Sequence, residues 1–183
     1  IGVEAPQVTV EVHIGNGMPG FTLVGLPETT VKESRDRVRS ALINSRFEFP
    51  AKRITVNLAP ADLPKEGGRF DLPIALGILA ASEQVPMDKL NQHEFIGELA
   101  LSGELRSVKG VLPAALAANR VQRQLVVPAC NGDQAALVGK DQHKSAESLL
   151  EVCADLFGQK RLSLHHITKP IQRPTSKQDL RDI

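Results

Sequence analysis

The chain has 183 residues, 42% of them hydrophobic, which suits one domain with a sizeable core plus a tail. Only 3% of the residues are aromatic, with no Trp or Tyr, so a platform that stacks single-stranded bases is not expected. The net charge of +1 gives no global field toward DNA or a membrane, and no apolar run approaches the roughly 20 residues of a membrane span.

The chain begins at Ile1 without a signal-like segment, and we expect it to be part of a longer cytoplasmic protein. Cys130 and Cys153 fall in separate predicted elements and show no CxxC spacing. This favours a reduced chain, and one structural disulfide is the alternative. The histidines form neither HExxH nor a Cys-His metal spacing, so no metal site is predicted.

The first expected elements are two short strands. Residues 8–14 alternate apolar and polar, and residues 21–24 follow a glycine-rich turn, so the two segments predict a β-hairpin. The turn at residues 15–20 matches the GxGxxG pattern of dinucleotide sites, which need a helix immediately after the glycines. A strand follows here, so a plain turn is favoured.

A long helix is predicted from residue 26 to 45. Its expected buried face consists of Val31, Val38, Ala41 and Leu42. Basic residues cluster in and after this helix: Lys32, Arg35, Arg37, Arg39, Arg46, Lys52 and Arg53. A solvated face with i,i+4 ion pairs is the favoured interpretation, and a surface that contacts phosphate is the alternative.

A glycine-rich loop then joins a buried strand, 54–58, to a very apolar helix, 72–81. Loops held between rigid elements often carry active sites. This loop contains Lys65 and Arg69 but no Ser, Cys or His. Because a nucleophile is missing, we favour a structural turn. In this turn Lys65 or Arg69 would form an ion pair with Glu66 or Asp71, and Asp71 would cap the helix.

The second half adds a hairpin across 102–104, an Ala-rich helix and a buried strand. Two further helices are expected near 131–133 and over 145–157, the second capped by Ser145. The order of hairpins and strand–helix–strand units predicts an α/β (α+β) fold with a mixed sheet.

The domain is expected to span residues 1–158, because the hydrophobic pattern fades after it and residues 159–183 are typical of a linker. No GxxxxGK[ST] sequence occurs in either part. We therefore expect no cofactor and no ATP hydrolysis in this chain by itself.

Three segments, 27–42, 57–76 and 97–106, closely resemble the amino-terminal region of the ComM/YifB family, the bacterial magnesium-chelatase-like AAA+ ATPases. The resemblance covers nearly the whole chain, and residues 174–183 look like the approach to the family's AAA+ module. It implies a fold similar to the Lon protease domain, or to a ribosomal-protein second domain.

The resemblance to Lon-type proteases gives a comparison for the glycine loop. Lys65 matches the start of the Lon catalytic loop, Arg69 falls where those proteases have Ser, and Leu112 falls near their Lys. An Arg cannot attack a carbonyl and a Leu cannot accept its proton, so peptidase activity is not expected unless Ser107 and Lys109 act together in an unrelated geometry.

The resemblance implies that the full-length protein is a homo-hexameric AAA+ motor that uses ATP and magnesium and acts on DNA, in branch migration during natural transformation and recombination. This chain would be its non-catalytic amino-terminal domain, which helps to assemble the hexamer or guides DNA. The candidate contacts to phosphate or to a neighbouring subunit are Arg35, Arg39, Lys65 and Arg69. Two alternatives stay open: a true magnesium-chelatase subunit, and a degenerate Lon-like adaptor that binds peptide.

Overall fold

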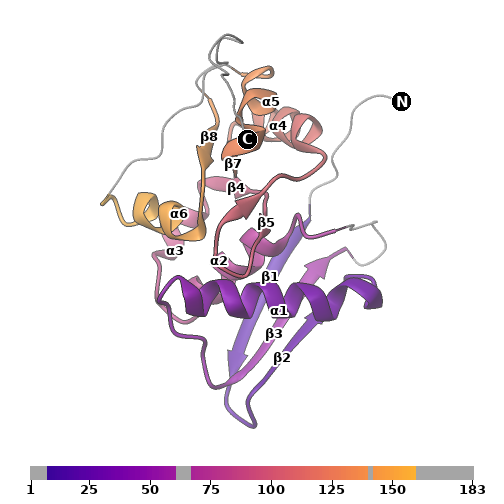
Figure 1. The fold of residues 1–183 in the computed structure, drawn as a ribbon, viewed down its shortest axis with the longest axis vertical. Helices are drawn as coiled ribbons and strands as arrows, with labels where there is room; N and C mark the ends of the chain where they lie inside the picture. The colour runs from indigo at the N-terminus through magenta and orange to yellow at the C-terminus, as the bar shows by residue number, and fades with distance from the viewer. Residues whose placement is uncertain (1–7, 61–66, 140–141, 160–183) are drawn as a thin grey trace, which may run out of the picture.

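The structure, a computed structural model, describes residues 8–60, 67–139 and 142–159 of the chain. Its elements are β1 (Thr9–Gly15), β2 (Gly20–Val24), α1 (Glu28–Asn44), β3 (Arg53–Ala59), α2 (Asp71–Ala81), α3 (Met87–Leu90), β4 (His93–Phe95), β5 (Glu98–Leu99), β6 (Leu105–Arg106), α4 (Val111–Arg120), β7 (Gln124–Pro128), the 3-10 helix η1 (Ala129–Asn131), α5 (Gly132–Ala136), β8 (Lys144–Ala146) and α6 (Leu149–Leu156). Helices combined with parallel and antiparallel strands confirm the predicted fold class (Figure 1). Lys65 and residues 160–183 of the predicted linker lie outside the described residues, so the boundary at 158 stays a prediction.

The first sheet has the strand order β1-β3-β2, so the hairpin predicted between residues 8–14 and 21–24 is wrong. β1 pairs antiparallel with β3, and β2 pairs parallel with it. β3 takes the centre because Ile54, Val56 and Leu58 are all fully buried, whereas the outer strands keep exposed residues at alternate positions. The alternation of apolar and polar residues predicts each strand correctly. It does not predict which strands pair, because the pairing depends on which surfaces the sheet buries.

The helices α1 and α2 pack against this sheet (Figure 1). In α1 the predicted face is buried except that Val31 is only partly covered. In α2 nearly every side chain is buried, and a Cβ at Gly77 would lie 2.7 Å from a methyl carbon of Val12 in β1. Gly77 therefore allows helix and strand to approach closely. No helix of the described residues is both long enough and apolar enough to cross a bilayer.

The second half contains a parallel sheet of order β4-β7-β8 and the short antiparallel pair β5–β6. That pair confirms the hairpin predicted across residues 102–104, in which Glu98 lies opposite Arg106. α4 and α5 pack on β7 around a second cluster of buried side chains. The members of this cluster are Ile96, Val111, Ala115, Ala118, Leu125, Val127 and Ala135.

The last helix begins later than predicted, and Ser145 does not cap it. Ser145 lies in β8, which pairs parallel with β7. The cap is Ser148, whose hydroxyl oxygen accepts the Glu151 amide at 3.1 Å, while the Glu151 carboxylate accepts the Glu147 amide at 2.9 Å. Ser148 and Glu151 have the Ser-x-x-Glu spacing of a capping box, which is the better sequence signal.

The cysteines are both free thiols, so the alternative of a disulfide is not realised. Cys130 is exposed, whereas Cys153 is buried in α6. Burial raises the pKa of the Cys153 thiol to about 12. Because the thiolate is the reactive form, the two cysteines differ strongly in expected reactivity.

We predict that iodoacetamide at about pH 8 labels Cys130 and spares Cys153 in the folded chain, because the buried thiol is protonated there. Mass spectrometry of tryptic peptides measures both sites. In concentrated urea both should react, and a Cys130→Ser variant should stay unlabelled when folded. Equal labelling of both native thiols would contradict the burial of Cys153.

His143, immediately before β8, is 2% exposed. Its Nδ1 accepts the amide of Leu125 at 3.1 Å, which requires a neutral ring. Burial accordingly lowers the pKa of His143 below its ordinary value of 6.5. Because the unfolded chain then binds the proton more readily, the stability that depends on this ring is present above the ordinary pKa and is lost as the pH falls through it.

We predict that His143→Asn reduces the loss of unfolding free energy between about pH 7.5 and pH 5.5, because Asn keeps an acceptor and cannot take up a proton. Urea denaturation followed by circular dichroism at both pH values measures the difference. The exposed His13 supplies the control, since His13→Asn should leave the pH dependence unchanged. An unchanged pH dependence in His143→Asn would show that another group causes it.

Candidate functional site

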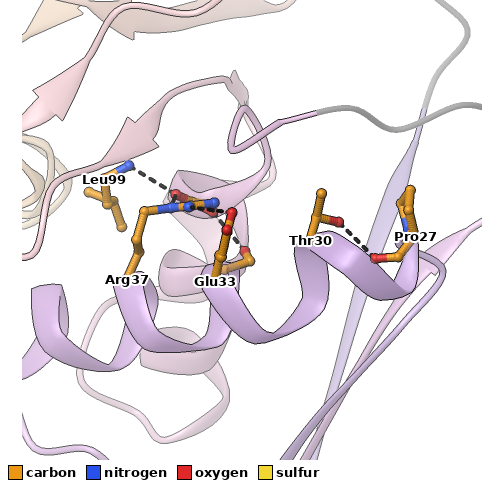
Figure 2. A network of polar contacts seen from close by, with 7 residues as sticks. Pro27, Thr30, Glu33, Arg37 and Leu99 are labelled. Carbon is orange, nitrogen blue, oxygen red and sulfur yellow. Dashed lines mark hydrogen bonds and ion pairs between the residues drawn. The ribbon is translucent and has the colours of Figure 1, made fainter.

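A buried carboxylate at the start of α2 lies at the centre of the candidate site. Asp71 is 0% exposed. Its Oδ1 accepts the Ser34 hydroxyl at 2.7 Å, and its Oδ2 accepts Arg37 Nε at 2.7 Å and the Leu99 amide at 3.1 Å. The carboxylate therefore joins α1, α2 and β5. Figure 2 shows Arg37 extending upward from α1 and Leu99 above it, with dashed lines for the contacts.

The role predicted for Asp71, an N-cap of α2, is wrong. The N-cap position is Phe70, without a side-chain cap bond, and Asp71 is the first helical residue. The side chain turns away from its own helix end because three donors on other elements meet it. Every contact is a donor to the carboxyl, which is the pattern of an ionised acid.

Burial and hydrogen bonding act in opposite directions on this pair. Burial raises the pKa of the Asp71 carboxyl, and the hydrogen bonds from Arg37, Ser34 and Leu99 lower it in part. For Arg37, burial lowers the pKa, but the hydrogen bond and the charge of Asp71, together with the charges of Glu98 and Glu33, more than compensate and raise it. The guanidinium therefore stays charged, and the pair forms a largely buried salt bridge.

The two glycines before Asp71 shape the loop in different ways. Gly67 has a φ of +62°, in the left-handed region that favours glycine. At Gly68 an added Cβ would collide with Glu98 and lie 2.8 Å from Arg37 Nη2. Two backbone bonds then fix the turn to the next strand, from the Gly97 amide to the Arg69 carbonyl and from the Leu72 amide to the Gly97 carbonyl, each 3.0 Å long.

Arg69 reaches the start of α4. Gly110, the N-cap of α4, has a φ of +83°, and a Cβ there would lie 2.7 Å from Arg69 Nη1. Arg69 also lies over the ring of Phe70, with 5.4 Å from its Cζ to the ring centroid. Leu112 follows in the first turn of α4 and is 38% exposed. The positions at which the resemblance implies lost Ser and Lys groups thus lie on adjoining elements.

The buried hydroxyl beside Asp71 is not placed to act as a nucleophile. Ser34 is 1% exposed, and its hydroxyl donates to Asp71, so an incoming carbonyl cannot reach it. Ser107 and Lys109 lie exposed between β6 and α4. Among the described residues, no group of three His, Cys, Asp or Glu side chains could hold a metal ion.

Arg35 and Arg39 lie together on another side of α1, beside two aromatic rings. Arg35 Nη1 donates to the Phe21 carbonyl at 3.0 Å, and Arg39 Cζ lies 4.7 Å from the centroid of the Phe49 ring. The rings of Phe21 and Phe49 contact each other, with centroids 5.5 Å apart. The structure thus brings Arg35 and Arg39 together, places Arg69 elsewhere and leaves Lys65 outside the described residues.

Sequence reasoning missed Ser34 and Arg37 as partners of Asp71. The available signal was weak, because Ser34 continues the apolar stripe of Val38 and Ala41 by helical spacing. A small polar residue within such a stripe indicates a buried hydrogen bond, since burying it without one is costly. Arg37 carried no comparable signal, because it lies among several other basic residues.

Comparisons with known proteins agree with the resemblance. A family model described as subunit ChlI of Mg-chelatase matches residues 10–131. The chain is 62% identical over 164 residues to the competence protein ComM of Haemophilus influenzae, covering 90% of this chain and 32% of that protein. It is 54% identical over all 183 residues to YifB of Salmonella typhimurium and 39% identical to a protein of Mycobacterium tuberculosis, covering 36% of each. The chain therefore spans about a third of the length of these relatives.

We predict that Arg37→Met lowers the free energy of unfolding by about 3–5 kcal/mol, because it leaves the Asp71 charge buried without its partner. The double variant Arg37→Met/Asp71→Leu should be more stable than the sum of the single effects, because no charge is then left buried alone. Urea denaturation followed by circular dichroism measures all three variants.

Glu33 supplies the matched control for this prediction. It lies 3.9 Å from Arg37 Nη1 on the same helix, but its side chain is 72% exposed. Glu33→Ala should therefore cost less than about 0.5 kcal/mol. If Arg37→Met costs no more than Glu33→Ala, the buried pair does not hold the site together.

Proposed function

The chain belongs to the family of subunit ChlI of Mg-chelatase, among the ComM/YifB proteins, and from this we propose that it is the non-catalytic domain of a bacterial AAA+ motor and guides DNA to that motor. The motor module, with its ATP and magnesium, would lie in the part of the longer relatives that this chain does not span. The whole protein would act as a cytoplasmic homo-hexamer in branch migration of recombination intermediates. The name of the Haemophilus influenzae relative, a competence protein, supports a role in natural transformation.

The observation that carries the DNA proposal is a group of four basic residues, which we call the basic edge: Arg35, Arg39, Lys52 and Arg53. The Gly20 amide donates to the Lys52 carbonyl at 3.2 Å, and Gly20 also pairs with Arg53. Phe21, the next residue, accepts Arg35. These contacts gather residues from α1 and from the start of β3 at one end of the sheet.

The basic edge has the properties of a phosphate-binding surface. Arg39, Lys52 and Arg53 are exposed. The two arginines are held in place by a carbonyl and an aromatic ring, so less side-chain freedom is lost when they bind. A guanidinium has five donor N–H groups, and Arg35 uses one on Phe21, which leaves others for phosphate oxygens. Such contacts bind DNA without reading its sequence, as a domain that guides branched DNA requires.

Lys65 and Arg69 are the remaining candidate contacts to phosphate or to a neighbouring subunit. Arg69 lies beside α4 and not at the basic edge. We therefore treat it as a separate site from Arg35 and Arg39, and the two sites can be tested independently.

We predict that Arg35→Ala/Arg39→Ala weakens binding of the chain to a four-way DNA junction by about tenfold at moderate salt. The slope of log affinity against log salt should fall by about two, because each lost phosphate contact removes roughly one released counterion. Fluorescence anisotropy of labelled junction across a salt series measures both quantities.

The matched control is Arg106→Ala/Lys109→Ala, which removes the same charge from exposed positions outside the basic edge. It should leave affinity and slope close to those of the unchanged chain. Equal losses of affinity in both variants would show that only net charge matters. No measurable binding at low salt would show that this domain does not bind DNA. A chelatase assay on the full-length protein separates this proposal from the alternative of a magnesium-chelatase subunit.

A further inference from the structure

Two adjoining recesses lie beside α2 and α3. The first, which we call the groove, has a volume of about 630 Å³ and is lined by residues of β1, β4, α2, α3 and α4. The second, which we call the hollow, has a volume of about 720 Å³ and is lined by residues 80–81, 83–89 and 156–157. Ala80, Ala81 and Met87 line both recesses, so the hollow opens into the groove.

The hollow exposes large apolar side chains. Met87 of α3 is 54% exposed, and Phe157, which follows α6, is 48% exposed. Two further apolar residues of its lining, Val85 and Leu156, are buried. Exposed side chains of this size that gather around a recess are typical of a surface that another segment covers.

The hollow also carries negative charge. Glu83 and Asp88 line it and are exposed, and neither forms an ion pair with another described residue. Lys89 is the one basic residue among the described residues of the lining, so acids outnumber bases. The hollow is therefore suited to an apolar segment that carries basic residues.

The described chain leaves α6 at this hollow. The amides of Phe157 and Gly158 donate to carbonyls of the last turn of α6 at 3.0 Å, and the amide of Gln159 donates to the Ala154 carbonyl at 2.9 Å. Gly158 has a φ of +76°, in the left-handed region that commonly ends a helix. Residue 160 is thus three residues beyond Phe157, at most about 10 Å along an extended chain.

The residues that follow have a composition that matches the hollow. Lys160 and Arg161 come first, Leu162 and Leu164 alternate with Ser163, and no acid occurs between residues 160 and 178. In an extended segment the alternation places Leu162 and Leu164 on the same side. These residues lie outside the described part of the chain. Their order supplies both the positive charge and the apolar side chains that the hollow requires.

We propose that residues 160–164 of this same chain occupy the hollow as an extended segment. Leu162 and Leu164 would cover Met87 and Phe157, and the basic pair before them would bind the two acids of the hollow. The docking itself does not depend on DNA binding or on a motor. Its consequence does rest on the proposed function, because docking would fix the point at which the chain leaves the domain toward the motor module.

The covalent connection favours this segment over a separate partner. Because residue 160 follows directly after the described end of the chain at Gln159, its effective concentration at the hollow is in the millimolar range, and weak contacts suffice to hold it there. A separate peptide would have to offset the loss of its translational and rotational freedom. A second copy could insert the same residues, and dilution separates that arrangement from docking within one chain.

The chain has no Trp, so Leu162→Trp places a single Trp emitter in the proposed segment. Acrylamide should quench its fluorescence about threefold less than that of Leu180→Trp, which lies beyond the segment, because a docked ring is shielded from water. In a chain without Trp, Leu162→Ser/Leu164→Ser should speed hydrogen exchange of the amides of residues 84–90 severalfold. This variant should bind the four-way DNA junction as the unchanged chain does.

Charge reversal in the Leu162→Trp chain tests the ion pairs. Glu83→Lys/Asp88→Lys should raise the quenching to that of Leu180→Trp, and the further change Lys160→Glu/Arg161→Glu should restore the protection. The matched control is Glu28→Lys/Glu104→Lys, which reverses two exposed acids outside both recesses and should leave the quenching unchanged. Circular dichroism should show that each variant is folded.

Four results would overturn the proposal. Equal quenching of Leu162→Trp and Leu180→Trp, with unchanged hydrogen exchange in Leu162→Ser/Leu164→Ser, would show that the segment does not occupy the hollow. Protection that the second charge reversal fails to restore would exclude the ion pairs. An equal loss of protection in the control would show that only net charge matters. Protection that disappears on dilution would identify a second copy as the source of the segment.

Discussion

The buried salt bridge between Arg37 and Asp71 is the contact on which the arrangement of this domain depends. A carboxylate without partners would be strongly destabilising at a position with no exposed surface. Asp71 is accommodated only if Arg37 and Ser34 of α1 and the Leu99 amide of β5 are all in place. The orientation of α1, the start of α2 and the path of β5 are therefore fixed together, in a way that apolar packing alone would specify less strictly.

The same contact also shapes the described part of the glycine loop, residues 67–70. Gly68 of this loop lies against Arg37 and Glu98, and the backbone of Arg69 and Leu72 is bonded to Gly97. This geometry positions residue 69 beside the start of α4, where a nucleophile and a base could meet. In this chain the position carries Arg69, whose positive charge can bind an anion but cannot attack a carbonyl. The loop therefore presents an anion-binding side chain at a position where a nucleophile would be needed for acyl transfer.

The sequence predicts the local elements of this domain well and their partners poorly. Helical spacing correctly places α1, one face of which is buried, and the continuous apolar run correctly places α2, which is buried on nearly all sides. The predicted hairpin between β1 and β2 is wrong, because β3, in which Ile54, Val56 and Leu58 are fully buried, lies between them. The role of Asp71 fails for a related reason, since a cap depends on neighbours in sequence, whereas Ser34 and Leu99 approach only in the folded chain. Arg35 and Arg39 were predicted from their charge and their place on the helix. Their contacts with Phe21 and Phe49 could not be predicted, because Phe21 lies on β2 and Phe49 follows α1.

The basic edge and the groove lie at opposite edges of the first sheet, beside β2 and β1 respectively. The basic edge is next to Gly20 and Arg53, where β2 and β3 begin. The groove begins at Thr9 of β1, which lies opposite Ala59 at the other end of β3. Val12 of β1 also lines the groove and lies opposite Val56, so along β3 the two surfaces come within about 10 Å of each other. DNA at the basic edge is therefore expected to contact the β2 side of the sheet, whereas the groove lies beside β1.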